Sequence, residues 1–300
     1  MKNNQSKIMA AVLVLVFCFF LVLAANKTEE KEYQVSSVRV GQKEMGSLQL
    51  AVSSAETILN KEKFQSLETE LKGMIKSKGG RWNIYVKNLS TGDSISINNE
   101  QGKAASLIKL FVMAYAYEHL DTSDSWIKQN LEIMITHSDN EAYNSLVRAC
   151  GDGSFANGAR KINKWLEENS YATTKVYNTL EPSRSAPASI APYSNPTSAE
   201  ECGRLLEEIY NGTCVSKEAS QEMLALLCQQ VLTSKIPQGI PDEIVVANKT
   251  GEALDRQHDV AIVFGPKADY ILCVMSEGDY KDSAIFTIRD ISEMVYQYLQ

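Results

Sequence analysis

Strand-like sequence lies near both ends of this 300-residue chain, and helical sequence fills the middle. The early strands are RWNIYVKNL (residues 81–89) and DSISIN (93–98), which alternate apolar and polar residues around the turn STGD. The late strands are IVVANKT (244–250), HDVAIVFG (258–265) and DYILCVMSEG (269–278). A single sheet completed by pieces from both ends, with a helical block inserted between them, is the simplest packing of this order.

Helical spacing of apolar residues fills the remaining segments. The predicted fold is a mixed α/β fold of the α+β type, with an antiparallel five-stranded sheet, flanking N- and C-terminal helices and an inserted all-helical subdomain. We expect one domain over residues 55–300, with a sheet part at 55–100 and 243–300 and a helical part at 101–242. The expected helices cover residues 55–76, 105–119, 126–136, 139–150, 158–169, 198–211, 217–231 and 283–299.

Ser106 and Lys109 interrupt the apolar segment AASLIKLFVMAYAY (104–117). Their spacing puts them one helical turn apart on the same face, where an apolar setting would lower the pKa of the lysine and let it take the serine proton. The alternative is a helix cap with a lysine that extends to solvent. The same spacing recurs at Ser125 and Lys128, where we expect only a capping serine and a solvated lysine.

HSDNEAYN (137–144) is a second candidate for chemistry. The Ser138 hydroxyl is suited to relay a proton, and the Asn140 amide is suited to hold a substrate. The structural alternative is a capping box, in which Ser138 and Glu141 close the start of the following helix.

NKTGE (248–252) is the third candidate for chemistry. On a strand that faces a cleft, Lys249 and Thr250 would bind a carboxylate, and Gly251 would allow another backbone or a ligand to come close. The alternative is an ordinary strand end with a glycine turn.

Together, Ser-x-x-Lys, Ser-Asp-Asn and Lys-Thr-Gly, in this order and on these elements, resemble the motifs of class A serine β-lactamases and the related penicillin-recognising D,D-peptidases. The resemblance covers about residues 55–300. It implies that Ser106 is the acylated nucleophile and that Lys109 accepts or relays its proton. Ser138 would then pass a proton to the leaving nitrogen.

The same resemblance implies the substrate contacts. Asn140 would contact the amide side chain of the substrate, while Lys249 and Thr250, next to Gly251, would hold its carboxylate. Backbone N–H groups of the nucleophile and of Glu252 would form the oxyanion hole.

In class A enzymes a glutamate on a loop before the Lys-Thr-Gly strand activates the water that releases the acyl group. Glu181, followed by a proline, matches it, but residues 184–185 are Arg-Ser where the family has Leu-Asn. Thr179 and Ser194 stand where the family pairs an arginine with an aspartate. Four prolines between residues 182 and 196 are expected to stiffen the loop instead. The alternative is a solvated loop glutamate without a catalytic role.

A further departure follows the third motif. Arg256 precedes the next strand, but on that strand the usual arginine is replaced by the pair His258-Asp259. With Glu252 at the mouth of the site, we expect anionic penicillins to be held less well than in a dedicated resistance enzyme.

The sequence therefore predicts an exported serine hydrolase that opens β-lactam amides through a Ser106 acyl-enzyme and a water-mediated deacylation, with no cofactor or metal. Two alternatives stay open: a D,D-peptidase or penicillin-binding protein acting on peptidoglycan peptides, and a non-catalytic, tethered wall-binding or sensor domain. The expected partner is a small β-lactam or a peptidoglycan peptide, and the expected state is a monomer.

The N-terminus predicts export. Lys2 and Lys7 precede an uncharged, apolar run of eighteen residues, 8–25. We expect residues 1–25 to be a signal peptide or a membrane anchor, followed by a polar linker at 26–54. The domain would then lie outside the cell, at its surface or in the periplasm.

Composition excludes other classes. The chain carries 30 basic and 37 acidic side chains without a basic block, so no nucleic-acid partner is expected. Its three histidines are scattered and there is no Cys-x-x-Cys pair, so no metal site is expected. The cysteines after residue 25 are expected to be mostly core residues, with one disulfide among Cys202, Cys214 and Cys228 left open: Cys150, Cys202, Cys214, Cys228 and Cys273.

Overall fold

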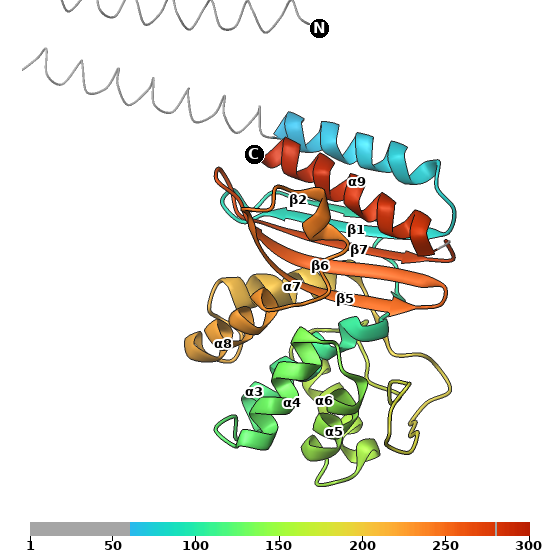
Figure 1. The fold of residues 1–300 in the computed structure, drawn as a ribbon, viewed down its shortest axis with the longest axis vertical. Helices are drawn as coiled ribbons and strands as arrows, with labels where there is room; N and C mark the ends of the chain where they lie inside the picture. Colours follow the sequence, from blue (N-terminus) through green and yellow to red (C-terminus); the bar gives the residue numbers. More distant parts are fainter. Residues whose placement is uncertain (1–60, 280) are drawn as a thin grey trace, which may run out of the picture. The chain divides into compact units, whose positions relative to one another are not determined.

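The computed structural model describes residues 61–279 and 281–300. Its central feature is a five-stranded antiparallel sheet with the strand order β2-β1-β7-β6-β5 (Figure 1). The predicted fold class is therefore confirmed, because strands from before and after the helical block share one sheet. The strands are β1 (Arg81–Asn88), β2 (Ser94–Ile97), β5 (Val245–Ala253), β6 (Arg256–Phe264) and β7 (Tyr270–Glu277).

Helices cover both faces of the sheet. The helix at residues 61–76 and α9 (Lys281–Leu299) lie side by side on one face (Figure 1). Their apolar side chains form one core with the strands beneath them. On the other face α7 (Ala199–Tyr210) packs against β1, β6 and β7, and α8 (Lys217–Cys228) follows it. Thus α7 covers the sheet, although it lies within the predicted helical part.

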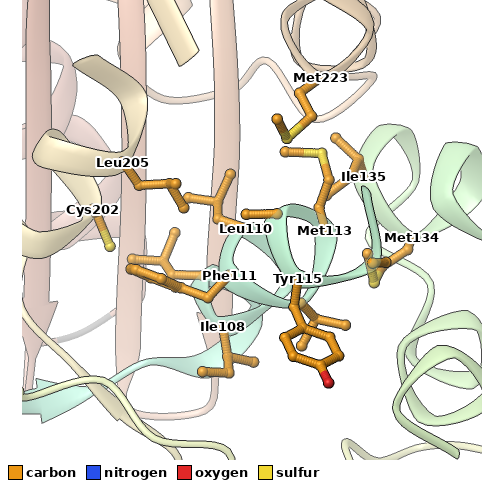
Figure 2. Close-up of a cluster of buried hydrophobic side chains, with 14 of the residues drawn as sticks. Ile108, Leu110, Phe111, Met113, Tyr115, Met134, Ile135, Cys202, Leu205 and Met223 are labelled. Carbon is orange, nitrogen blue, oxygen red and sulfur yellow. The ribbon is translucent and has the colours of Figure 1, made fainter. Parts of the chain in front are cut away.

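The remaining helices form a block beside β5, which is one of the two edge strands of the sheet (Figure 1). Its first helix, α3, is buried from Ile108 through Ala116. Figure 2 shows part of the reason: side chains of α4, α7 and α8 lie around it, and α5 and α6 also pack against it. A helix that is apolar all round needs such enclosure. The block comprises α3 (Ile108–His119), α4 (Ser125–Thr136), α5 (Asn140–Cys150) and α6 (Phe155–Glu168).

Short elements connect the block to the sheet. The strands β3 (Gly102–Lys103) and β4 (Pro196–Thr197) pair with each other. The 3₁₀ turn η1 (Ala105–Leu107) links β3 to α3, and η2 (Ile236–Gly239) precedes β5. The turn η1, which carries Ser106, therefore lies between the paired strand β3 and the buried helix α3.

Two expected helix caps are wrong. Asp124, rather than Ser125, accepts hydrogen bonds from the first N–H groups of α4. Asp139 caps α5 by accepting from Ala142 N at 2.7 Å, so the proposed capping box of Ser138 and Glu141 does not form. Each aspartate is next to the expected serine and offers a charged acceptor at the helix N-terminus.

The cysteines that the structure describes are all free thiols, so no disulfide joins Cys202, Cys214 and Cys228. Four of the five are buried, as expected for core residues, and Cys228 is exposed. The expected signal or anchor at residues 1–25 and the linker at 26–54 lie outside the described residues. Among the helices of the described part, none has the length and apolarity to cross a membrane.

Candidate active site

Ser106 lies at the centre of η1, directly before α3. The preceding residue, Ala105, has a φ of 45°, in the left-handed region. For a residue with a Cβ this conformation costs about 1–2 kcal/mol, and surrounding contacts must impose it. One such contact is the 2.7 Å hydrogen bond from Ala104 N to Asn195 O. The strained turn leaves Ser106 partly exposed while Leu107 is buried.

Lys109 is completely buried and lies 3.0 Å from Ser106 through its Nζ atom. Its other contacts are the carbonyl and the hydroxyl of Ser138, the latter at 3.2 Å, and Asn140 Oδ1 at 2.7 Å. Burial, reinforced by the charge of Lys249, lowers the pKa of Lys109 well below its usual value. The shift is toward the neutral amine, the form that a proton acceptor requires.

Ser138 joins the two lysines. It adopts a φ of 58° immediately before the Asp139 cap of α5. This left-handed residue turns the chain so that the Ser138 hydroxyl accepts from Lys249 Nζ at 2.8 Å and lies 3.2 Å from Lys109 Nζ. The hydroxyl thus retains its own proton for donation to a third group.

Lys249 is also fully buried, and its Nζ atom donates to its own strand at Thr250 O, at 2.8 Å. Burial lowers its pKa to about 7, against the opposing effect of the nearby Asp259 carboxylate. Asp259 is itself buried, which raises its pKa to about 6. It accepts from Asn248 Nδ2 and Ile236 N, both at 2.9 Å.

Gly251 explains how β5 approaches the nucleophile so closely. A Cβ atom at this position would lie 3.1 Å from Ala104 O and from Leu107 Cγ, both at η1. Next to it, the Thr250 hydroxyl is buried and has no hydrogen-bond partner in the described part of the chain. It is therefore free to bind an acceptor that enters the site.

Glu181 differs from the other predicted residues. Its side chain is exposed and makes no hydrogen bond or ion pair with residues 61–279 or 281–300, so the structure does not join it to the lysine network. The backbone on either side is held by α5: Asn144 binds both Leu180 N, at 2.9 Å, and Leu180 O, at 3.0 Å. Asn140 Nδ2 donates weakly to Pro182 O at 3.4 Å.

The sequence matches the beta-lactamase enzyme family over residues 66–133 and 123–299. The chain belongs to the beta-lactamase enzyme family. Three solved structures are similar to it. PBP-A has 21% identity, with 77% of this chain and 95% of that chain covered at a TM-score of 0.67.

A mutant of PBP-A, in an acyl-enzyme complex with penicillin G, has 22% identity, with 78% and 96% covered and a TM-score of 0.68. The TLA-1 extended-spectrum β-lactamase has 17% identity, with 78% and 98% covered and a TM-score of 0.69. At these identities the likeness shows a shared fold, and the family match identifies a class A β-lactamase-like serine hydrolase.

Lys235 is a residue of this β-lactamase-family site that the sequence did not single out. It is completely buried and pairs with Glu252 at 2.5 Å. Its positive charge also acts on Asp259 and Lys249. A lysine in a loop before η2 carries no sequence signal of burial, because that burial arises from packing against the distant β6.

His258 lies on the strand where the family's arginine was expected, and its ring binds backbone groups of two other strands. Its Nε2 donates to Lys103 O at 2.9 Å, and its Nδ1 accepts from Ser276 N at 3.2 Å. Burial lowers its pKa to about 4, so the ring is neutral and connects β3 to β7. Across the described residues there is no group of three or more acidic, histidine or cysteine side chains arranged to hold a metal ion.

Glu141 holds the loop after Glu181 and was missed as a functional candidate. Its carboxylate accepts from Ser183 Oγ at 2.5 Å, from the backbone N–H groups of Arg184 and Ser185 at 2.9 Å, and from the Ser185 hydroxyl. These hydrogen bonds lower its pKa to about 2. The loop is therefore fixed by a carboxylate of α5 where the ion pair between positions 179 and 194 is absent.

Proposed function

We propose that this protein is an exported serine hydrolase that opens the amide bond of β-lactams through a Ser106 acyl-enzyme. The observation that carries the proposal is the buried Lys109 amine at 3.0 Å from Ser106 Oγ, joined through Ser138 to Lys249. Such a group of two lysines and two hydroxyls supports proton transfer without a histidine.

Acylation begins with the proton of Ser106. A neutral lysine has two N–H groups, and the closest acceptors of Lys109 are the Ser138 carbonyl and Asn140 Oδ1. Its lone pair is then directed to the Ser106 hydroxyl. As the O–H bond breaks, the proton goes to Lys109 Nζ and the serine oxygen bonds to the substrate carbonyl carbon.

The carbonyl electrons move to oxygen, and the N–H groups of Ser106 and Glu252 receive the developing charge. When the C–N bond breaks, its electron pair stays on nitrogen, which takes the proton of the Ser138 hydroxyl. Ser138 recovers a proton from Lys109, which returns that lysine to its neutral form. Lys249 supports Ser138 during this step through its 2.8 Å hydrogen bond.

Deacylation is assigned to a water activated by Glu181. The water loses a proton to the carboxylate, and its oxygen bonds to the ester carbon. The bond from that carbon to Ser106 Oγ then breaks, and the serine oxygen takes up the proton that Glu181 received, which restores both the hydroxyl and the carboxylate. The anchoring of Leu180 by Asn144 supports a fixed position for the Glu181 backbone. Thr250, with its unpartnered hydroxyl, and Lys249 are assigned to the substrate carboxylate.

A penicillin-binding protein or D,D-peptidase is the second candidate, and one observation favours it. Glu181 is exposed and makes no contact with the lysine network in the described chain. An acyl-enzyme that lacks an activated water persists, as expected of a protein that reacts with penicillin without turning it over.

Intact-mass spectrometry with benzylpenicillin separates these functions. The proposal predicts an adduct of one penicillin that appears and then disappears, and that is absent in Ser106→Ala. Glu181→Ala should form the adduct and retain it. A persistent adduct on the native protein would assign the penicillin-binding function, whereas no adduct would leave the non-catalytic binding domain as the better account.

Export is proposed from residues 1–25 alone. Fractionation of cells that produce the full chain should recover the protein outside the cytoplasm, free if the segment is cleaved and in membranes if it is retained. Recovery from the cytoplasm would contradict this part of the proposal.

A further inference from the structure

A cavity of about 150 Å³ lies beside the nucleophile. Its lining includes Ala105, which precedes Ser106, and Leu180, which precedes Glu181. The positions of the missing ion pair, Thr179 and Ser194, line it as well. Because these two side chains are small, the space that a charged pair would fill stays open.

The charged residues in this lining are both cations. Lys103 approaches from β3 and Arg256 from the start of β6, and no carboxylate lines the cavity. Asp255 counters them from outside the lining, at 2.7 Å from Arg256 Nη2 and 3.9 Å from Lys103 Nζ. Glu277, opposite Arg256 in the register of β6 and β7, lies nearby as well, where it accepts from Lys103 N and pairs with Arg81 at 2.7 Å. Neither acid lines the cavity, so the side chains that face an entering group are the two cations, which favour an anion.

The donors of this lining are short of acceptors. Arg256, whose side chain is 14% exposed, has Asp255 as its one polar contact among the described residues. Its buried Nε has no partner there, and the exposed Ser194 lies in the same lining. A guanidinium has five N–H donors, so several remain for an oxygen ligand.

The cavity also continues toward solvent. A neighbouring cavity of about 360 Å³ shares Lys103 and Ser194 with it and adds Arg81 and Tyr193. The two cavities together extend from Ala105, the residue before the nucleophile, toward solvent, with Lys103, Arg256 and Arg81 along them.

We propose that the cavity is an anion subsite, in which Arg256 and Lys103 bind a carboxylate on the acyl side chain of the substrate. The inference rests on the proposed function, because it takes Ser106 as the point of attack. It places the preferred substrates among compounds whose acyl side chain is acidic, such as peptides with a side-chain or branch carboxylate.

Two penicillins that differ by one carboxylate test the subsite. Benzylpenicillin and its α-carboxy analogue are compared by their second-order rates of acylation, measured by intact mass in the native protein and in Arg256→Gln. Comparing the ratio of the two rates between the native protein and the variant cancels the intrinsic reactivity of each compound. Losing hydrogen bonds to a carboxylate should lower the α-carboxy/benzyl ratio about tenfold in Arg256→Gln.

The controls separate charge from folding. Lys164→Gln, a residue 77% exposed on α6, removes one positive charge far from the cavity lining and should leave the ratio unchanged. Arg256→Lys should retain most of the preference. Lys103→Gln, which alters a half-exposed side chain, repeats the test if Arg256→Gln does not fold.

A ratio that is the same in the native protein, Arg256→Gln and Lys103→Gln would overturn the subsite while leaving Ser106 acylation intact. A native protein that forms no adduct with benzylpenicillin would instead refute the proposed function. The two failures are therefore distinguishable within one experiment.

Discussion

Replacing Glu141 by glutamine should loosen the loop that follows Glu181 without unfolding the domain. The carboxylate accepts four hydrogen bonds from residues 183–185, two of them from backbone N–H groups. An amide oxygen in the place of Oε2 retains the bonds from Ser183 Oγ, Arg184 N and Ser185 N, so the bond from the Ser185 hydroxyl to Oε1 is the one lost. At about 1 kcal/mol for this bond, opening of the loop becomes about fivefold more frequent.

Hydrogen exchange measured by mass spectrometry on peptides from residues 180–190 should report this change, while peptides from β6 retain their protection. Glu168→Gln, which removes an exposed carboxylate of α6, is the matched control. The acyl-enzyme should also persist longer in Glu141→Gln, with acylation unchanged. Equal loop exchange in the native protein and Glu141→Gln would refute the assignment of Glu141 as the residue that fixes this loop.

The pKa of Glu141 determines how the stability of the loop at residues 183–185 changes with pH. The folded state lowers the pKa of Glu141 from 4.5 to about 2. Its contribution is therefore complete above pH 4.5 and is lost as the pH falls toward 2. Loop exchange, corrected for intrinsic rates, should stay slow at pH 5 and increase at the acid end.

Three other outcomes follow from the site. The acylation rate should rise with pH as Lys109 loses its proton and fall as Lys249, which holds the substrate carboxylate as a cation, loses its own proton near pH 7. Asp259→Asn should shift the fall to lower pH because Asp259 raises the pKa of Lys249; a shift of the fall to higher pH in a pH–rate profile would contradict it. Gly251→Ala should slow acylation and cost about 1–3 kcal/mol in thermal unfolding, since its Cβ would lie 3.1 Å from η1; a native melting temperature and rate would contradict that contact. Glu252 pairs with Lys235, which places a negative charge beside the site. Glu252→Gln should therefore raise the ratio of the acylation rate with benzylpenicillin to that with its uncharged methyl ester about tenfold at low salt. An unchanged ratio would show that Glu252 does not select the substrate.

The sequence alone was sufficient to predict features that depend on the spacing of neighbouring residues. Ser106 and Lys109 are three residues apart, and the start of one helix brings their side chains to 3.0 Å. The alternation of residues 81–98 and the apolar runs of 244–278 similarly predicted which segments become strands. In each case neighbouring residues determine the outcome.

The sequence alone was not sufficient to predict contacts between residues far apart in the chain, or which of two adjacent residues caps a helix. Glu141 contacts a loop more than forty residues away, and nothing in its own helix indicates that contact. Lys235 resembles a surface lysine until packing buries it against Glu252. At the start of α5, Ser138 and Asp139 are both residue types that commonly cap helices. In the structure the Ser138 hydroxyl accepts a hydrogen bond from Lys249, and Asp139 caps the helix.

The pairing of β1 with β7 has a consequence for the order in which the molecule is built. Tyr85 lies opposite Cys273, so the centre of the sheet stays incomplete until the last tenth of the chain has left the ribosome. Contacts between such distant segments form slowly. Lys249 arrives with these late strands, whereas Ser106 and Lys109 are made much earlier. A nascent or truncated chain therefore carries its nucleophile without the second lysine, and reactivity appears only when synthesis and folding are both finished.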